Sequence, residues 1–162
     1  MTGTLEAIAI RPTRKQKMVT LDQVFVDSAQ GLVGDHAGKR PDRLVTMITV
    51  EGWAAACANL DPPLDPVCDL SWLTRRANLL VSGEQLPRAP GGIVQVGPVT
   101  LYVTGFTYPC SRMESAQSGL LKALAQDWRA GVLCSVIKEG HITVGDTVKT
   151  LHAPAPIIRK LP

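Results

Sequence analysis

A cysteine beside an arginine is the clearest candidate for chemistry in this sequence. Cys110 follows Pro109 and precedes Ser111 and Arg112, where an alternating apolar segment that starts at Val99 comes to an end. A nearby cation favours the thiolate, which is the nucleophilic and metal-binding form of cysteine. The alternative is a small apolar side chain that closes a strand, because free cysteine is among the most buried residue types. These residues alone leave both interpretations open.

A second candidate group lies just before another apolar segment. Arg75, Arg76 and Asn78 precede residues 79–81. A guanidinium offers a planar fork of donors to phosphate or carboxylate, and an amide both donates and accepts. On a strand, Arg76 and Asn78 would point to the same face, which favours one shared ligand. The structural alternative is an ion pair with a local acid and a turn stabilised by the asparagine.

The third candidate is a glycine-rich loop over residues 31–38, in which three glycines surround Asp35 and His36. Glycines allow backbone conformations that expose amide groups, but their spacing here does not match a dinucleotide-binding fingerprint. Either Asp35 caps backbone amides in a turn, or Asp35 or His36 faces a ligand. The basic segment 13–18 is interpreted as a solvated loop, with a phosphate-attracting rim as the alternative.

The segments that must position these side chains alternate between apolar and polar residues, which predicts short strands. The 14 glycines and 12 prolines also favour turns and short strands over a helical bundle. Helices are predicted over residues 51–60 and 118–129. The predicted strands cover residues 5–11, 19–26, 44–50, 79–81, 93–96, 99–104, 131–138, 142–144 and 147–151. This content predicts a mainly β protein, a closed or half-closed β-barrel with two or three appended short helices, whose mouth is a natural ligand site.

Composition narrows the class of protein. The 162 residues predict one domain over 1–151 and a proline-rich tail over 152–162. Basic residues are dispersed and the net charge is only +3, which argues against a nucleic-acid interface. The sequence shows no export signal and no apolar segment of membrane-spanning length, so we expect a cytoplasmic protein with no membrane contact. The cysteines are therefore expected to be reduced, because the cytoplasm keeps thiols reduced.

The other cysteines are interpreted as structural. Cys57 and Cys134 lie in a predicted helix and a predicted strand, where packing is their expected role, and Cys68 is given no role. No Cys-x-x-Cys pair indicates a zinc site.

Eight segments in one order resemble the stand-alone bacterial MOSC domains, named for the C-terminal domain of molybdenum cofactor sulfurase. The resemblance extends from about residue 5 to residue 151 and implies a β-barrel like that of the pyruvate kinase barrel domain. The segments are GLVGDHAG (31–38), DRLVTMIT (42–49), RRANLLVSG (75–83), VGPVTLYVTG (96–105), YPCSRME (108–114), SGLLKAL (118–124), RAGVLCSVIKEG (129–140) and ITVGDTVKTL (142–151).

The resemblance also implies roles for the candidate residues. Cys110 matches the signature cysteine, which is proposed to carry sulfur as a persulfide or to ligate molybdenum in a molybdopterin cofactor. Arg76 and Asn78 match the Arg-x-Asn position associated with the pterin and its phosphate, and Arg43 matches a position at the same mouth. Asp35 and His36 match a Gly-Asp-x-His loop that is one residue shorter here. The resemblance also implies an association of the family with pyridoxal phosphate binding.

Three classes of function follow as expectations. The first is a molybdenum-cofactor-dependent reductase of N-hydroxylated compounds, in which Cys110 ligates the metal and Arg43, Arg76 and Asn78 anchor the cofactor. The second is a sulfur carrier in which Cys110 holds a persulfide. The third is a non-catalytic module that binds or delivers molybdopterin or another small anion. The sequence contains no desulfurase or electron-transfer region, so a separate redox or sulfur-donor protein is expected as partner.

Overall fold

Seven strands close into a barrel in the computed structural model, which describes residues 2–36 and 40–157. The barrel order is β11-β7-β8-β9-β5-β6-β1, and pairing between β11 and β1 closes it. Strand β2 extends the sheet beyond β1, and β10, β3 and β4 form a second small sheet. The prediction of a mainly β barrel is confirmed in its closed form.

The elements have the following bounds. The strands are β1 (Gly3–Ile10), β2 (Val19–Leu21), β3 (Gln23–Asp27), β4 (Gly31–Leu32), β5 (Val45–Thr49), β6 (Leu79–Ser82), β7 (Ile93–Val96), β8 (Val99–Phe106), β9 (Val132–Lys138), β10 (Gly140–Thr143) and β11 (Thr147–His152). The helices are the 3-10 turns η1 (Pro41–Arg43) and η2 (Trp72–Arg75) and the α-helices α1 (Val50–Ala58), α2 (Ser111–Ala116) and α3 (Leu120–Leu124).

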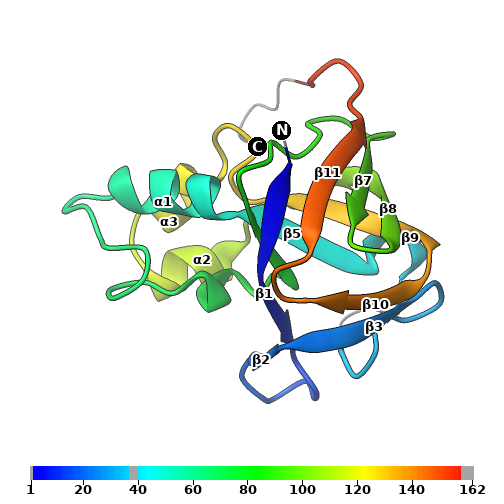
Figure 1. The fold of residues 1–162 in the computed structure, drawn as a ribbon. Coiled ribbons are helices and arrows are strands. Elements are labelled where there is room, and N and C mark those ends of the chain that lie inside the picture. The colour runs from blue at the N-terminus through cyan, green and yellow to red at the C-terminus, as the bar shows by residue number, and fades with distance from the viewer. Residues whose placement is uncertain (1, 37–39, 158–162) are drawn as a thin grey trace.

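Two apolar cores result from this arrangement. The barrel interior is filled by aliphatic side chains such as Leu5, Ile8 and Leu79, as alternation along the strands requires. A second core lies between the barrel and the three α-helices, which gather on one side of it (Figure 1). Trp53 of α1 anchors that core, and its indole N–H donates to the carbonyl oxygen of Leu70 at 3.0 Å.

Among the described strands, β5 and β6 form the one parallel pair, in which Met47 lies opposite Leu79. A parallel pair cannot be joined by a tight hairpin, so the chain must cross over outside the sheet. The crossover covers residues 50–78 and contains α1, a loop with three prolines (Pro62, Pro63 and Pro66) and η2. It returns to the barrel directly at the predicted Arg-x-Asn position.

The helical prediction was right for α1 and too long for α3. Thr49 caps α1 by accepting the N–H of Gly52 at 2.9 Å. The helix predicted over 118–129 is only Leu120–Leu124, because Asp127 and Trp128 adopt left-handed backbone angles (φ 50° and 57°) that end helical geometry. Trp128 instead turns its ring edge-on to Phe106, with ring centroids 5.1 Å apart.

Strand β8 is irregular near its end, because the register between β8 and β9 shifts between Val103 and Gly105. The proline-rich tail predicted over 152–162 begins where β11 ends. Its described part is attached through Ile157, which donates to the carbonyl oxygen of Arg88 and accepts from the Trp128 indole. Residues 158–162 lie outside the described residues.

No helix in the described ranges is long and apolar enough to cross a membrane.

Candidate functional site

A cavity of about 360 Å³ brings most of the predicted site residues together. Its walls come from the chain after β1, the loop after β4, η1, β5, the segment from η2 to β6, and the connection from β8 to α2. Among the described residues, six arginines and one carboxylate contribute to it. The residues that line it are Arg11, Met18, Asp35, Arg40, Arg43, Thr46, Arg75, Arg76, Ala77, Asn78, Thr107, Cys110, Arg112, Met113 and Ala130.

Cys110 lies at this cavity, but not at the end of a strand as predicted. Strand β8 ends at Phe106, and Cys110 is the extended residue immediately before α2, a helix that the sequence analysis missed. Its carbonyl oxygen accepts the N–H of Met113 at 2.9 Å, while its side chain makes no capping hydrogen bond. The thiol is solvent-exposed and free of a disulfide, so it is accessible to a ligand or reagent.

Arg75 is a buried cation in the cavity wall. Its Nε donates to the carbonyl oxygen of Ala130 at 3.1 Å and its Nη2 to that of Thr107 at 3.2 Å. In the described part of the chain it forms no ion pair with an acid. The pKa of Arg75 is lowered to about 10, mainly by burial and also by Arg43, while the charge of the Cys110 thiolate acts in the opposite direction. The guanidinium therefore lies within electrostatic reach of the thiol.

Arg76 differs from its neighbour in being exposed. It occupies a left-handed position (φ 63°) that ends η2, and β6 begins only at Leu79. The assumption that Arg76 and Asn78 share a strand face was therefore wrong, although both line the cavity. Partial burial, Arg11 and Arg112 lower the pKa of Arg76, which shows that cations are crowded at the mouth.

Asn78 is buried and its amide is fully used within the protein. Its Oδ1 accepts the backbone N–H and the hydroxyl of Thr46, at 3.1 and 3.2 Å. Its Nδ2 donates to the carbonyl oxygen of Ala9 at 3.1 Å and to the Asp35 carboxylate at 2.9 Å. An amide has two donor hydrogens and accepts about two hydrogen bonds, so little capacity remains for a ligand. Asn78 thus ties β1, β5 and the glycine loop together.

Asp35 and His36 have different positions. The Asp35 carboxylate accepts the backbone N–H of Arg11 at 3.0 Å in addition to the Asn78 amide, and it lines the cavity. This is the amide-capping alternative for Asp35. His36 is exposed, its backbone N–H donates to the carbonyl oxygen of Arg11, and it is not among the described residues that line the cavity. The expected ligand contact of His36 therefore has no support here.

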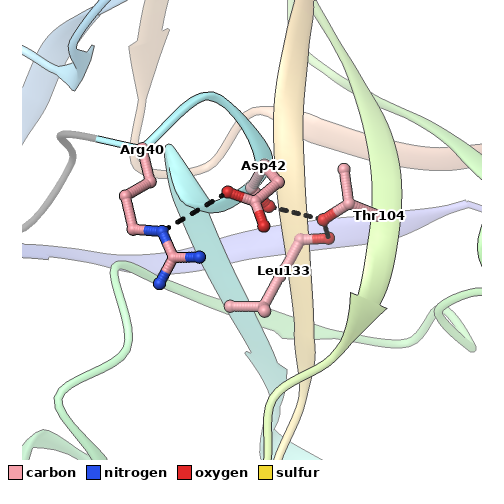
Figure 2. A network of polar contacts seen from close by, with 4 residues as sticks. All are labelled: Arg40, Asp42, Thr104 and Leu133. Carbon is pink, nitrogen blue, oxygen red and sulfur yellow. Dashed lines mark hydrogen bonds and ion pairs between the residues drawn. The ribbon is translucent and has the colours of Figure 1, made fainter.

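A side chain on β8 holds η1 at the cavity (Figure 2). The Thr104 hydroxyl lies 2.5 Å from the carbonyl oxygen of Asp42 and 3.1 Å from that of Leu133 in β9. Arg40 and Asp42 also form an ion pair at 3.7 Å. Through this contact the predicted residue Arg43, at the end of η1, is kept beside the cavity that it lines.

Thr107 was not singled out by the sequence analysis. It is 8% exposed, lines the cavity, and lies three positions before Cys110. Its Oγ1 is the one buried side-chain polar atom without a hydrogen-bond partner in the described ranges. Buried polar atoms are nearly always paired, so this hydroxyl indicates a missing partner.

Within the described residues, no three His, Cys, Asp or Glu side chains gather closely enough to hold a metal ion. A metal at Cys110 would therefore need most of its ligands from a cofactor.

A second hollow, of about 560 Å³, is lined by residues from the ranges 49–55, 83–88 and 127–132. Glu51, Glu84 and Asp127 line it together with Arg88 and Arg129, so its charges are mixed. The carboxylates of Glu51 and Glu84 already accept the backbone N–H groups of Gly83 and Thr150. It contains no cysteine among its described lining residues and lacks the concentration of cations of the first cavity.

Comparisons with known proteins agree with this fold. The MOSC domain profile matches residues 33–149. Among solved structures, the YUAD protein from Bacillus subtilis is 20% identical, with a TM-score of 0.71 over 91% of this chain and 94% of that one. YiiM from Escherichia coli is 17% identical, with a TM-score of 0.70 over 97% of this chain and 73% of that one. YiiM from Geobacillus stearothermophilus is 18% identical, with a TM-score of 0.66 over 93% and 75%.

No curated protein sequence gives a significant match. At these identities the solved structures establish the fold, while the profile covers most of the barrel and the residues from Asp35 to Cys110. The chain therefore belongs to the MOSC domain family.

Proposed function

We propose that the cavity binds an anionic molybdenum cofactor and that Cys110 is the protein ligand to its metal. One observation carries the proposal: an exposed thiol shares a cavity with six arginines. The one carboxylate among the described lining residues, Asp35, is engaged by hydrogen bonds within the protein. Arginine matches phosphate groups, and a thiolate suits a soft metal.

The residues present fit such a group. Among the described residues, buried Arg75 has no acidic partner and the Thr107 hydroxyl has no hydrogen-bond partner, so both can interact with a bound anion. Arg43 and Arg76 would hold the anionic part of the cofactor, and Cys110 would hold the metal. When bound, the cofactor supplies a metal that can change its oxidation state. Asn78 would keep the cavity wall in place rather than contact the ligand.

Reduction of N-hydroxylated compounds is the reaction that we assign to this arrangement. The exposed mouth at Cys110 leaves the reacting end of the cavity open to a small substrate. A separate redox protein would have to supply the electrons.

A sulfur-carrier function is the second candidate, because the Cys110 thiol is exposed and makes no capping hydrogen bond. In this reaction the Cys110 thiolate attacks the terminal sulfur of a donor protein's persulfide. A new S–S bond forms at Cys110 as the donor's S–S bond breaks, and the donor leaves as a thiolate, so no electrons are gained or lost overall. It predicts sulfur on Cys110 that cyanide releases.

Molybdenum content per chain tests the first proposal. The protein is produced in a host that makes the cofactor, with Cys110→Ala and, as a matched control, Cys68→Ala. Cys68 is also an exposed free thiol but does not line the cavity. We expect near-stoichiometric molybdenum in the parent and in Cys68→Ala, and its loss in Cys110→Ala.

Molybdenum that is absent from the parent, or equal in the parent and Cys110→Ala, contradicts the proposal. Cyanide-labile sulfur in the parent and its loss in Cys110→Ala would then support sulfur carriage. If both assays are negative, the remaining function is binding of another small anion.

A further inference from the structure

The unpaired hydroxyl of Thr107 lies in a rigid part of the cavity wall. The backbone N–H of Thr107 donates to the carbonyl oxygen of Gly131 at 3.0 Å, and its own carbonyl oxygen accepts from Arg75. Both backbone groups are therefore fixed, and only the side-chain oxygen lacks a partner. A hydroxyl can donate one hydrogen bond, which a ligand oxygen could accept.

Arg75 lies against the same residue and also has donors to spare. A guanidinium has five N–H groups, and the structure assigns two of them, to the carbonyl oxygens of Ala130 and Thr107. Arg75 is 8% exposed and forms no ion pair with a described acid. A buried charge without a counter-ion is costly, so an anion beside it would be strongly favoured.

We propose that Arg75 and Thr107 form an oxyanion subsite in the cavity wall, which binds one tetrahedral oxyanion such as phosphate. The oxyanion is either a group on a larger ligand or a free ion. This inference rests on the proposed function for its cavity, and it assigns anion binding to two residues outside the Arg-x-Asn position. It does not depend on Cys110 or on a metal.

The chemistry of the two residues selects an oxyanion over a neutral ligand. Arg75 presents fixed, charged N–H donors. The Thr107 hydroxyl can donate one further hydrogen bond to an oxygen of the same anion. Asp35 also lines the cavity, but its carboxylate oxygens accept from Arg11 and Asn78 instead. The donors of Arg75 are thus left for an incoming anion.

Calorimetric titration with inorganic phosphate tests the subsite in the full-length protein without molybdenum. Thr107→Val removes the hydroxyl but keeps the shape, and no hydrogen bond within the described residues is lost with it. We expect phosphate binding in the parent, and an affinity at least roughly tenfold weaker in Thr107→Val, as for loss of a charge-assisted hydrogen bond. Thr107→Ser should retain most of the affinity, because it keeps the hydroxyl.

Two further variants complete the design. Arg75→Lys keeps the charge but removes the fork, and it should also weaken phosphate binding; it serves as a second test if Thr107→Val folds poorly. Lys149→Gln, on the exposed surface of β11, controls for general loss of positive charge and should leave the affinity unchanged.

Phenyl phosphate distinguishes the two sources of the oxyanion. Competition between phenyl phosphate and inorganic phosphate assigns the subsite to a phosphate group on a larger ligand, whereas binding of inorganic phosphate alone assigns it to a free ion. The proposal is overturned if the parent binds no phosphate up to about 10 mM. Equal affinities of the parent and Thr107→Val also overturn it. None of these titrations needs molybdenum. Failure of the cofactor proposal is therefore detected by the molybdenum assay alone, separately from failure of the phosphate subsite.

Discussion

The amide of Asn78 connects three separate parts of the chain at one point of the site. Ala9, Thr46 and Asp35 are its partners, and they belong to β1, β5 and the glycine loop. The resemblance to MOSC domains implied a ligand contact for this residue. The hydrogen bonds instead favour a supporting role, which leads to an effect on stability that a ligand contact would not produce.

Asn78→Ala is expected to lower the free energy of unfolding by about 2–4 kcal/mol, because it leaves the Thr46 amide without its partner and the Asp35 carboxylate with only the Arg11 N–H, in a partly buried setting. Urea denaturation measures the change. Arg76→Gln is the control, since Arg76 is exposed at the same cavity and should change stability by less than about 0.5 kcal/mol. Unchanged stability in Asn78→Ala, with loss of ligand, would show that Asn78 is a ligand contact.

The different burial of two adjacent arginines could not be predicted from the sequence. Arg75 and Arg76 have the same donors and nearly the same sequence surroundings, yet Arg75 is buried and Arg76 is exposed. The difference comes from the left-handed residue that ends η2, which turns one guanidinium into the wall and the other to the mouth. Nothing in a single sequence specifies that turn, so Arg75 and its contact Thr107 could not be distinguished in advance.

At the scale of elements, the short helix η1 is positioned by a hydroxyl and not by its ion pair. Thr104 contacts the carbonyl oxygen of Asp42, whereas Arg40 contacts the Asp42 carboxylate in an exposed pair at 3.7 Å (Figure 2). Exposed ion pairs contribute little to stability. The two contacts can therefore be separated by substitution.

Thr104→Val is expected to weaken phosphate affinity of the cavity by roughly threefold to tenfold, because η1 and Arg43 lose a fixed position. Asp42→Asn keeps the carbonyl oxygen that Thr104 contacts, so its affinity should stay close to that of the parent. Calorimetry on both variants provides the measurement. Equal losses in the two variants would assign the effect to the ion pair.

Two glycines with the same backbone angle separate steric from conformational effects. Gly131 and Gly145 both have φ of +99°. A Cβ on Gly131 would lie 2.2 Å from the carbonyl oxygen of Met47 in β5, while a Cβ on Gly145 would meet nothing within 4 Å. Gly131 also adjoins Ala130, whose carbonyl oxygen holds Arg75.

Gly145→Ala is expected to cost about 1–2 kcal/mol from the left-handed backbone alone. Gly131→Ala should cost at least about 3 kcal/mol, or prevent folding, because β5 and β9 must separate. Thermal and urea denaturation measure both changes. If the two variants lose the same stability, the backbone near Gly131 relaxes freely and the steric argument fails.

Elements were predictable where the pattern is local. Alternation identified the strands of the barrel, and the alanine-rich segment identified α1. The length of α3 was not predictable, because the leucines and Trp128 keep helical spacing while the backbone at Asp127 leaves the helix. The parallel pairing of β5 with β6 could likewise not be predicted from the sequence, since the choice of partner strand depends on the whole sheet.

For the whole molecule, two buried thiols give the fold a dependence on pH. Burial raises the pKa of Cys134 and of Cys57 above the ordinary value of 9.0, and Asp65 adds to the effect at Cys57. The folded chain therefore keeps these protons while the unfolded chain loses them above about pH 9. A folded-state pKa above the unfolded value means that stability is fully present at lower pH and falls as pH rises.

We expect the free energy of unfolding to decline above about pH 9 by up to about 1.4 kcal/mol per pH unit for each thiol. Urea denaturation between about pH 8 and pH 10 measures the slope. Cys134→Ala should reduce the slope, whatever its effect on stability at neutral pH. A slope equal to that of the parent would show that Cys134 does not retain its proton in the folded state.

The parallel pair of β5 and β6 has a consequence for how the molecule assembles. Asn78 lies 32 positions from Thr46 and 69 from Ala9, so its hydrogen bonds can form only after distant parts of the chain have met. The cavity lies along this junction, because Arg11, Thr46 and Ala77 line it just beyond or within the strands that meet there. A ligand bound in the cavity would therefore hold this junction together, and its binding free energy would add to the stability of the folded chain.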